Sequence, residues 1–162
     1  MPYAFSAEEV LRIAERIERN GSAFYRRAAA ATADEALRSK LLDLAQMEEG
    51  HQRTFAALRD GLAEPERKQA TADPEGEAAG YLAALANSSV FDERLDPTQL
   101  VDEAATPADL LQTAIRLEKD SILFYIGLRD LLGHAARDRI EEILSEEVGH
   151  VALLRSELPT SC

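Results

Sequence analysis

The sequence predicts an all-α fold, a four-helix bundle of two similar helical hairpins joined by a long crossover that contains a short helix. Its 162 residues are 46% hydrophobic, rich in Ala, Leu, Glu and Arg, and lack Trp, a composition typical of helical bundles. Apolar residues recur every three or four positions over four long stretches. Leu11 lies 100 residues before Leu111, and Tyr25 lies 100 before Tyr125, which indicates an internal duplication.

We expect a single domain over residues 1–162, with a first hairpin at 6–61, a crossover at 62–105 and a second hairpin at 106–158. A chain of this length buries a core without help from disulfides. Cys162 is the only cysteine, so neither a disulfide framework nor thiol redox chemistry is predicted.

In the first hairpin, one helix should begin at Ser6, which forms a Ser-x-x-Glu capping box with Glu9, and run to about Ala31. The next should run from about Asp34 to Asp60. The inner faces of these two helices are predicted to carry Leu11, Ala14, Glu18, Gly21 and Tyr25, then Leu37, Leu41, Leu44, Glu48, His51, Phe55 and Leu58.

In the second hairpin, Thr106 should cap a helix that has Pro107 in its first turn and ends near Leu132. The last helix should run from about Ala136 to Glu157. The inner faces here are predicted to carry Leu111, Ala114, Glu118, Ser121, Tyr125 and Leu128, then Ile140, Ile143, Glu147, His150 and Leu154.

The segment between the hairpins contains prolines and many acidic residues, which indicates a crossover and not a second domain. Residues 75–86 predict a short helix that bears Tyr81 and Leu82, and Val90-Phe91 follows. We expect this apolar patch to pack on the bundle. A dimer contact and a lid over the functional site are the alternatives.

Net charge and hydropathy exclude several classes of partner. The formal charge of −12, without a basic stripe, argues against binding to nucleic acid or anionic lipid. No apolar run approaches the length needed to cross a bilayer, and the first ten residues do not resemble a secretion signal. A cytoplasmic protein without membrane or nucleic-acid partners is therefore expected.

A Glu-x-x-His signature occurs twice, and each copy has a matching glutamate about thirty residues upstream. The candidate metal ligands are Glu18, Glu48, His51, Glu118, Glu147 and His150. The midpoint between Glu18 and Glu48 falls in a predicted turn, as does that between Glu118 and Glu147, so each hairpin should hold its two glutamates level, roughly 21 Å from the turn.

A buried cluster of these residues needs cations, because two carboxylates 4 Å apart repel by roughly 4 kcal/mol at an effective dielectric near 20. Two divalent ions would balance four carboxylates, and two imidazoles would complete the coordination. Positions i and i+3 share a helix face, so both side chains of Glu-x-x-His can reach one site. The alternative is that these residues are surface charges on long helices.

The ligand pattern resembles that of the ferritin-like di-iron carboxylate superfamily, most closely its rubrerythrin-type branch. The resemblance covers both hairpins. It implies two iron ions per chain, each bound by one histidine, His51 or His150, with Glu48 and Glu147 bridging them and Glu18 and Glu118 terminal. Oxygen and nitrogen donors would also accept Mn or Zn. By analogy with the family, a homodimer is expected.

The chain departs from the rubrerythrin pattern at two points. Ser121 stands where these proteins carry an additional ligand glutamate, so His51 should be a permanent ligand, as in the more symmetric site of bacterioferritin. No Cys-x-x-Cys pair is present in the sequence, so the rubredoxin domain that rubrerythrins commonly carry is not expected, and electrons would come from a separate donor protein.

The leading hypothesis from the resemblance is a di-iron oxidoreductase that reduces H2O2 or O2. A ferroxidase linked to iron storage or detoxification, with Fe(II) as its substrate, is a second hypothesis. A redox-silent module that holds zinc or manganese is a third.

Several other polar residues lie near the motifs. Tyr25 and Tyr125 lie two turns after Glu18 and Glu118, where each is either a core aromatic or a group that hydrogen-bonds a ligand carboxylate or supplies an electron. Glu15 is expected to form an exposed ion pair with Arg12 or Arg19, and a spare metal ligand or an iron entry group is the alternative. Glu49 and Glu146 are expected to face away from the partner helices.

Overall fold

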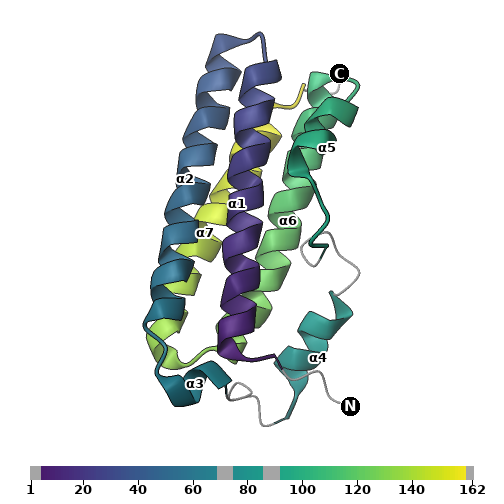
Figure 1. The fold of residues 1–162 in the computed structure, drawn as a ribbon. Helices are drawn as coiled ribbons and strands as arrows, with labels where there is room; N and C mark the ends of the chain where they lie inside the picture. Colours follow the sequence, from purple (N-terminus) through teal and green to yellow (C-terminus); the bar gives the residue numbers. More distant parts are fainter. Residues whose placement is uncertain (1–4, 69–74, 86–91, 160–162) are drawn as a thin grey trace.

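The computed structural model describes residues 5–68, 75–85 and 92–159. Four long helices lie side by side along one axis: α1 (Ala7–Ala31), α2 (Glu35–Asp60), α6 (Pro107–Leu131) and α7 (His134–Glu157) (Figure 1). The described parts of the connection between α2 and α6 hold three short helices: α3 (Glu64–Lys68), α4 (Glu77–Ala84) and α5 (Pro97–Glu103). The predicted all-α four-helix bundle is confirmed, and the described residues contain no strand.

The first helix of each hairpin begins at the cap that the sequence predicts. Ser6 and Glu9 form a reciprocal capping box, in which Glu9 N donates to Ser6 Oγ at 3.2 Å and Ser6 N donates to Glu9 Oε2 at 2.9 Å. Thr106 Oγ1 accepts from Asp109 N at 3.1 Å, ahead of the helix that starts at Pro107. These contacts satisfy backbone amides that have no partner inside the first helical turn.

Two features differ from the sequence-based expectation. The last helix begins at His134, two residues before the predicted Ala136, although its N-cap, Gly133, supplies no side-chain hydrogen bond. Like α3, the helix α5 is an addition to the predicted elements. Its signal is present in Asp96-Pro97, because the Asp96 side chain accepts from Thr98 N at 3.0 Å and proline suits the first helical turn.

The helix α4 packs against α6, as expected for the apolar part of the crossover. Tyr81 Oη donates to Leu123 O at 2.7 Å, and Leu82 is fully buried. A Cβ atom at Gly127 would lie 2.7 Å from Leu82 Cδ2, so the absence of a side chain there permits the close approach of α4. Residues 90–91, which belong to the same predicted patch, lie outside the described part of the chain.

The apolar core is divided into two clusters along the bundle. One includes Leu11, Phe55 and Leu128, from the start of α1 and the ends of α2 and α6. The other includes Leu41 and Leu111, from the starts of α2 and α6. These pairings show that α2 and α6 run in the same direction, so the crossover spans the length of the bundle (Figure 1). A layer of buried charged side chains lies between the clusters.

None of the described helices combines the length and the apolar character needed to cross a membrane.

Candidate metal centre

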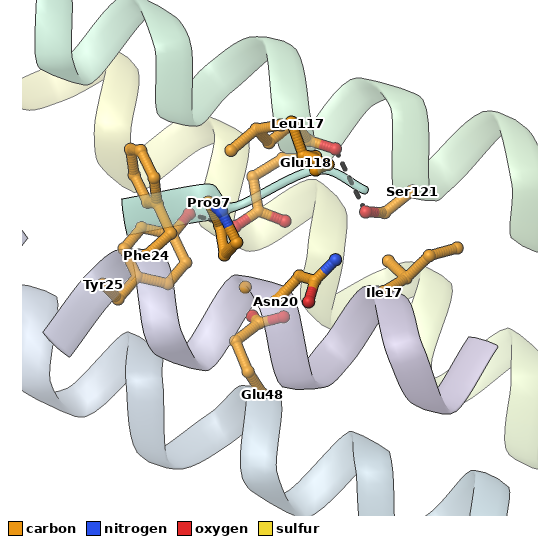
Figure 2. Close-up of a pocket in the computed structure, with 11 residues that line it drawn as sticks. Ile17, Asn20, Phe24, Tyr25, Glu48, Pro97, Leu117, Glu118 and Ser121 are labelled. Carbon is orange, nitrogen blue, oxygen red and sulfur yellow. Dashed lines mark hydrogen bonds between the residues drawn. The ribbon is translucent and has the colours of Figure 1, made fainter. Parts of the chain in front are cut away.

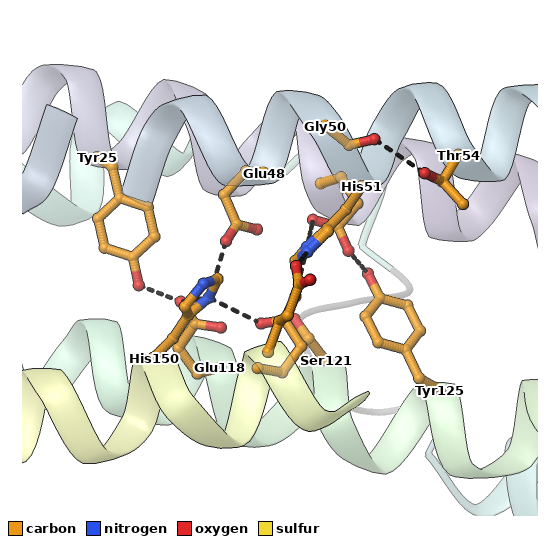
Figure 3. A network of polar contacts seen from close by, with 12 residues as sticks. Tyr25, Glu48, Gly50, His51, Thr54, Glu118, Ser121, Tyr125 and His150 are labelled. Carbon is orange, nitrogen blue, oxygen red and sulfur yellow. Dashed lines mark hydrogen bonds and ion pairs between the residues drawn. The ribbon is translucent and has the colours of Figure 1, made fainter. Parts of the chain in front are cut away.

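The four long helices each contribute side chains to the buried polar layer. The first helix of each hairpin contributes one glutamate, and the second contributes a glutamate and a histidine one turn later. The structure thus brings together all six predicted ligand residues, each at most 4% exposed: Glu18 on α1, Glu48 and His51 on α2, Glu118 on α6, and Glu147 and His150 on α7. Figure 3 shows Glu48, His51, Glu118 and His150 pointing into the space between the helices.

The donor atoms of these residues form two overlapping groups. In each group, the donor atoms lie within 4.8 Å of one another. One group consists of Glu18, Glu48, His51 and Glu147, and the other consists of Glu48, Glu118, Glu147 and His150. Because Glu48 and Glu147 belong to both groups, their carboxylates stand between two positions at which a cation would fit.

The two imidazoles face the carboxylates through Nδ1. His51 Nδ1 lies 2.8 Å from Glu147 Oε1 and 3.5 Å from Glu18 Oε2. His150 Nδ1 lies 3.2 Å from Glu48 Oε1 and 3.4 Å from Glu147 Oε2. The rings are stacked with centroids 5.8 Å apart, so the two halves of the site meet near the bundle axis.

Burial makes it unfavourable for all four carboxylates to be ionised together. It raises the pKa of Glu18 and Glu48 well above the ordinary value, and nearby carboxylates add to the effect. Burial and the adjacent Glu147 raise the pKa of Glu118 to about 8. Burial also opposes ionisation of Glu147, but contacts with the Glu118 carboxyl and both histidines outweigh it and lower the pKa of Glu147.

The histidines take up positive charge in the absence of metal. Burial acts to lower the pKa of both rings, but the surrounding carboxylates outweigh it. The contacts of His51 with Glu147 and Glu146 raise its pKa to about 9, and those of His150 with Glu118, Glu147 and other carboxylates raise its pKa to about 12. The cluster therefore requires positive charge, which protons supply when no metal ion does.

Several buried donor atoms of the cluster make no hydrogen bond, and together they fit a pair of divalent cations. Among the described residues, the buried side-chain atoms without a hydrogen-bond partner include Glu18 Oε2, Glu48 Oε1, both Glu147 oxygens, and Nδ1 of His51 and His150. Buried polar atoms seldom lack a partner unless an ion or water supplies one. A carboxylate and imidazole donor set without thiolate suits iron, manganese or zinc.

Two buried tyrosines connect the hairpins at the site. Tyr25 Oη donates to Glu118 Oε1, and Tyr125 Oη donates to Glu18 Oε1 (Figure 3). Burial and the neighbouring carboxylates raise the pKa of both phenols well above 10, so both keep the proton that they donate. Each tyrosine thus orients a glutamate of the opposite hairpin.

Glu146 and Glu49 correct the expectation that both face away from the partner helices. His51 Nε2 donates to Glu146 Oε2 at 2.6 Å, from α2 to α7. Glu49 Oε1 accepts from Ser22 Oγ at 3.2 Å and from Arg26 Nε at 3.1 Å, both on α1. The only sequence signal for these contacts is adjacency to the ligands, because the length of a glutamate lets it bend around its own helix.

Glu15 also pairs differently from the prediction. Its Oε1 lies 2.6 Å from Arg59 Nε on α2, whereas Arg12 pairs with Glu8 at 2.7 Å. Glu15 therefore links the two helices of the first hairpin and does not belong to the cluster of ligand residues.

A cavity of about 40 Å³ connects the surface with one side of the cluster. Its lining includes two of the predicted ligand residues, Glu48 and Glu118, and two other polar side chains, Asn20 and Ser121 (Figure 2). Gly21 is also part of the lining, and a Cβ atom there would lie 2.8 Å from Glu48 Oε2. The cavity has room for one or a few water-sized molecules.

Comparison with known proteins places this architecture in a family. Residues 9–158 match the family model named Rubrerythrin. The fold is similar to that of a Thermotoga maritima protein described as a ferritin-like diiron-carboxylate protein, with a TM-score of 0.75, 24% identity and 95% of each chain covered. No curated protein matches the sequence. Because the family model spans nearly the whole chain, the protein belongs to the rubrerythrin family.

Proposed function

We propose that the protein is a di-iron oxidoreductase that reduces hydrogen peroxide or dioxygen with electrons from a separate donor protein. The observation that carries this proposal is the buried cluster of four glutamates and two histidines, whose donor atoms converge on two positions. Membership of the rubrerythrin family, together with the diiron-carboxylate description of the structural relative, favours iron and a count of two.

In this proposal, each hairpin would supply one glutamate and one histidine to one of the two irons. One iron would be held by Glu18 and His51, and the other by Glu118 and His150. Glu48 and Glu147, which belong to both groups, would bind both ions. Bound iron supplies two electrons per pair of ions, because each passes between the +2 and +3 states.

Reduction of H2O2 to two water molecules consumes two electrons and two protons. The two iron ions would account for the electrons, and solvent that enters the cavity beside Asn20 and Ser121 would supply the protons. Tyr25 and Tyr125 hold the carboxylates of Glu118 and Glu18 in place through hydrogen bonds. The surrounding apolar layers exclude bulk water from the remaining ligand atoms.

The size of the cavity favours a substrate of very few atoms. Its volume of about 40 Å³ is suited to dioxygen or hydrogen peroxide and is too small for an ordinary organic substrate. Ser121 has a short side chain, which leaves the space beside Glu118 open. Oxidant would thus reach the ligands from the side lined by α1, α6 and the end of the crossover (Figure 2).

The decisive experiment is anaerobic loading with Fe(II), followed by separate mixing with H2O2 and with O2 while absorbance is recorded. The proposal expects two irons per chain and repeated turnover of one oxidant with an added reductant while both irons stay bound. A ferroxidase would instead consume many Fe(II) ions per chain and release Fe(III).

The matched control is the pair of variants Glu48→Ala and Glu147→Ala, which remove the carboxylates shared by both positions. Both should lose the two-iron stoichiometry and the reaction with oxidant. Oxidant reduction that survives in these variants, or a loaded protein that reacts with neither oxidant, overturns the proposal.

A further inference from the structure

The outer nitrogens of the two histidines are held differently. His51 Nε2 donates to Glu146 Oε2 at 2.6 Å. His150 Nε2 is buried and has no hydrogen-bond partner among the described residues. The internal repeat accounts for the difference: Glu147 corresponds to Glu48, so the position matching Glu146 is Met47, whose thioether is at most a weak acceptor.

This difference affects the strength of the histidines as metal ligands. His51 Nε2 donates to the Glu146 carboxylate, and Nδ1 of the same ring faces the carboxylate cluster, 2.8 Å from Glu147 Oε1. In the neutral ring that would bind a metal ion, Glu146 would thus keep the proton on Nε2 and leave the lone pair on Nδ1. A carboxylate partner also fixes the ring orientation and makes the imidazole a stronger donor. His150 lacks both effects, since no described group accepts from its Nε2.

The cavity adds a second, independent asymmetry. Its lining includes Glu118, which groups only with His150, and Glu48, which both groups share. Neither Glu18 nor either histidine is among the described residues that line it. The position at His150 is therefore the one that faces the route from solvent.

We propose that the two metal positions are inequivalent. The position at His51 retains its ion because Glu146 anchors that histidine. The position at His150 holds its ion more weakly and is where a small exogenous molecule, such as peroxide or dioxygen, meets the centre. Glu146 is thus a positioning residue that acts through His51. This inference rests on the proposed metal centre and names which half of it is exchangeable.

Stepwise anaerobic addition of Co(II), followed by visible absorbance and calorimetry, tests the inference without any turnover. The wild-type protein should bind two ions in two resolved steps. Glu146→Gln should weaken the tighter step by roughly 10- to 100-fold and leave the other step nearly unchanged. Met47→Glu, which installs the missing carboxylate in the other half, should tighten the weaker step.

Glu142→Gln is the matched control. It removes the same charge one turn earlier on α7, where Glu142 bonds Arg139 at 3.2 Å and is 63% exposed. Neither binding step should change in this variant, because the Glu142 carboxylate lies on the solvent side of α7 and is paired there with an arginine of its own helix.

Equal affinities at both positions, or a loss shared by both steps in Glu146→Gln, overturn the inference. If Glu146→Gln loses helicity in circular dichroism, Met47→Glu decides alone, and a weaker step left unchanged counts against the inference. The proposed function fails in a different way, when two-step binding is intact but the iron-loaded protein reacts with neither oxidant. Absence of any metal binding would reject both.

Discussion

Tyr25 on α1 donates its phenolic hydrogen bond to Glu118 on α6, across the interface between the two hairpins. Tyr125 on α6 makes the reciprocal bond to Glu18 on α1. The internal duplication therefore yields a crossed pair of contacts, in which each half of the chain orients one carboxylate of the other half. These bonds link the geometry of the candidate metal centre to the docking of the hairpins.

Removal of one of these hydroxyls should destabilise the fold. Tyr125→Phe leaves the buried Glu18 Oε1 without its donor, so the free energy of unfolding of the metal-free protein should fall by about 1–3 kcal/mol. Urea denaturation followed by circular dichroism measures the loss. Tyr81→Phe is the control, because Tyr81 donates to a backbone carbonyl nearer the surface, and its loss should be smaller. If both variants lost the same free energy of unfolding, the buried bond from Tyr125 to Glu18 would contribute no more than a bond near the surface.

Metal binding should stabilise the protein strongly. Cations relieve the repulsion among the buried carboxylates, and free metal at 100 times its dissociation constant adds about 2.7 kcal/mol to the free energy of unfolding. The melting temperature should therefore drop on chelation and recover when Fe(II) or Co(II) is restored. In Glu48→Gln the metal-dependent rise should shrink, while the metal-free form should melt higher than the wild type, because one buried carboxylate is gone. A melting temperature that chelation leaves unchanged would count against the site.

Gly21→Ala should weaken metal binding without lowering the stability of the fold. Alanine favours a helix interior over glycine by roughly 0.5–1 kcal/mol, but the new Cβ atom would lie 2.8 Å from Glu48 Oε2 and displace that carboxylate. We expect unchanged or higher stability together with weaker metal affinity. Gly149→Ala is the control, since no atom lies within 4 Å of its Cβ position, and it should gain stability alone. Equal metal affinity in both variants would show that Glu48 tolerates the contact.

Ser121→Leu should slow the reaction with oxidant by filling the cavity next to Glu118. The stoichiometry of bound metal should remain that of the wild type, because Ser121 donates to Leu117 O at 3.0 Å and is not among the grouped donor residues. Stopped-flow absorbance after mixing with H2O2 gives the rate. Ser121→Ala keeps the cavity open and should react at close to the wild-type rate. A Leu variant as fast as the Ala variant would mean that oxidant enters elsewhere.

The sequence alone predicts the four long helices and the residues that meet at their centre. Helix periodicity, caps such as Ser6 and Thr106, and the repeat are local properties, since each depends on spacing along the chain. The antiparallel hairpins then follow from the turns. Because a hairpin holds residues equidistant from its turn at one level, residue numbers alone are enough to place Glu18 and Glu48 at the same height in the bundle.

Tertiary packing decided the side-chain contacts and the helix placement that residue spacing does not encode. The bond from His51 to Glu146, the pair between Glu15 and Arg59, and the place of α5 beside the cavity depend on side-chain rotamers and on distances between helices. A glutamate on the solvent side of a helix has several rotamers of similar energy, and the neighbouring helix selects one of them. Sequence thus determined which groups could bind metal, and three-dimensional packing determined how the two halves of that centre differ.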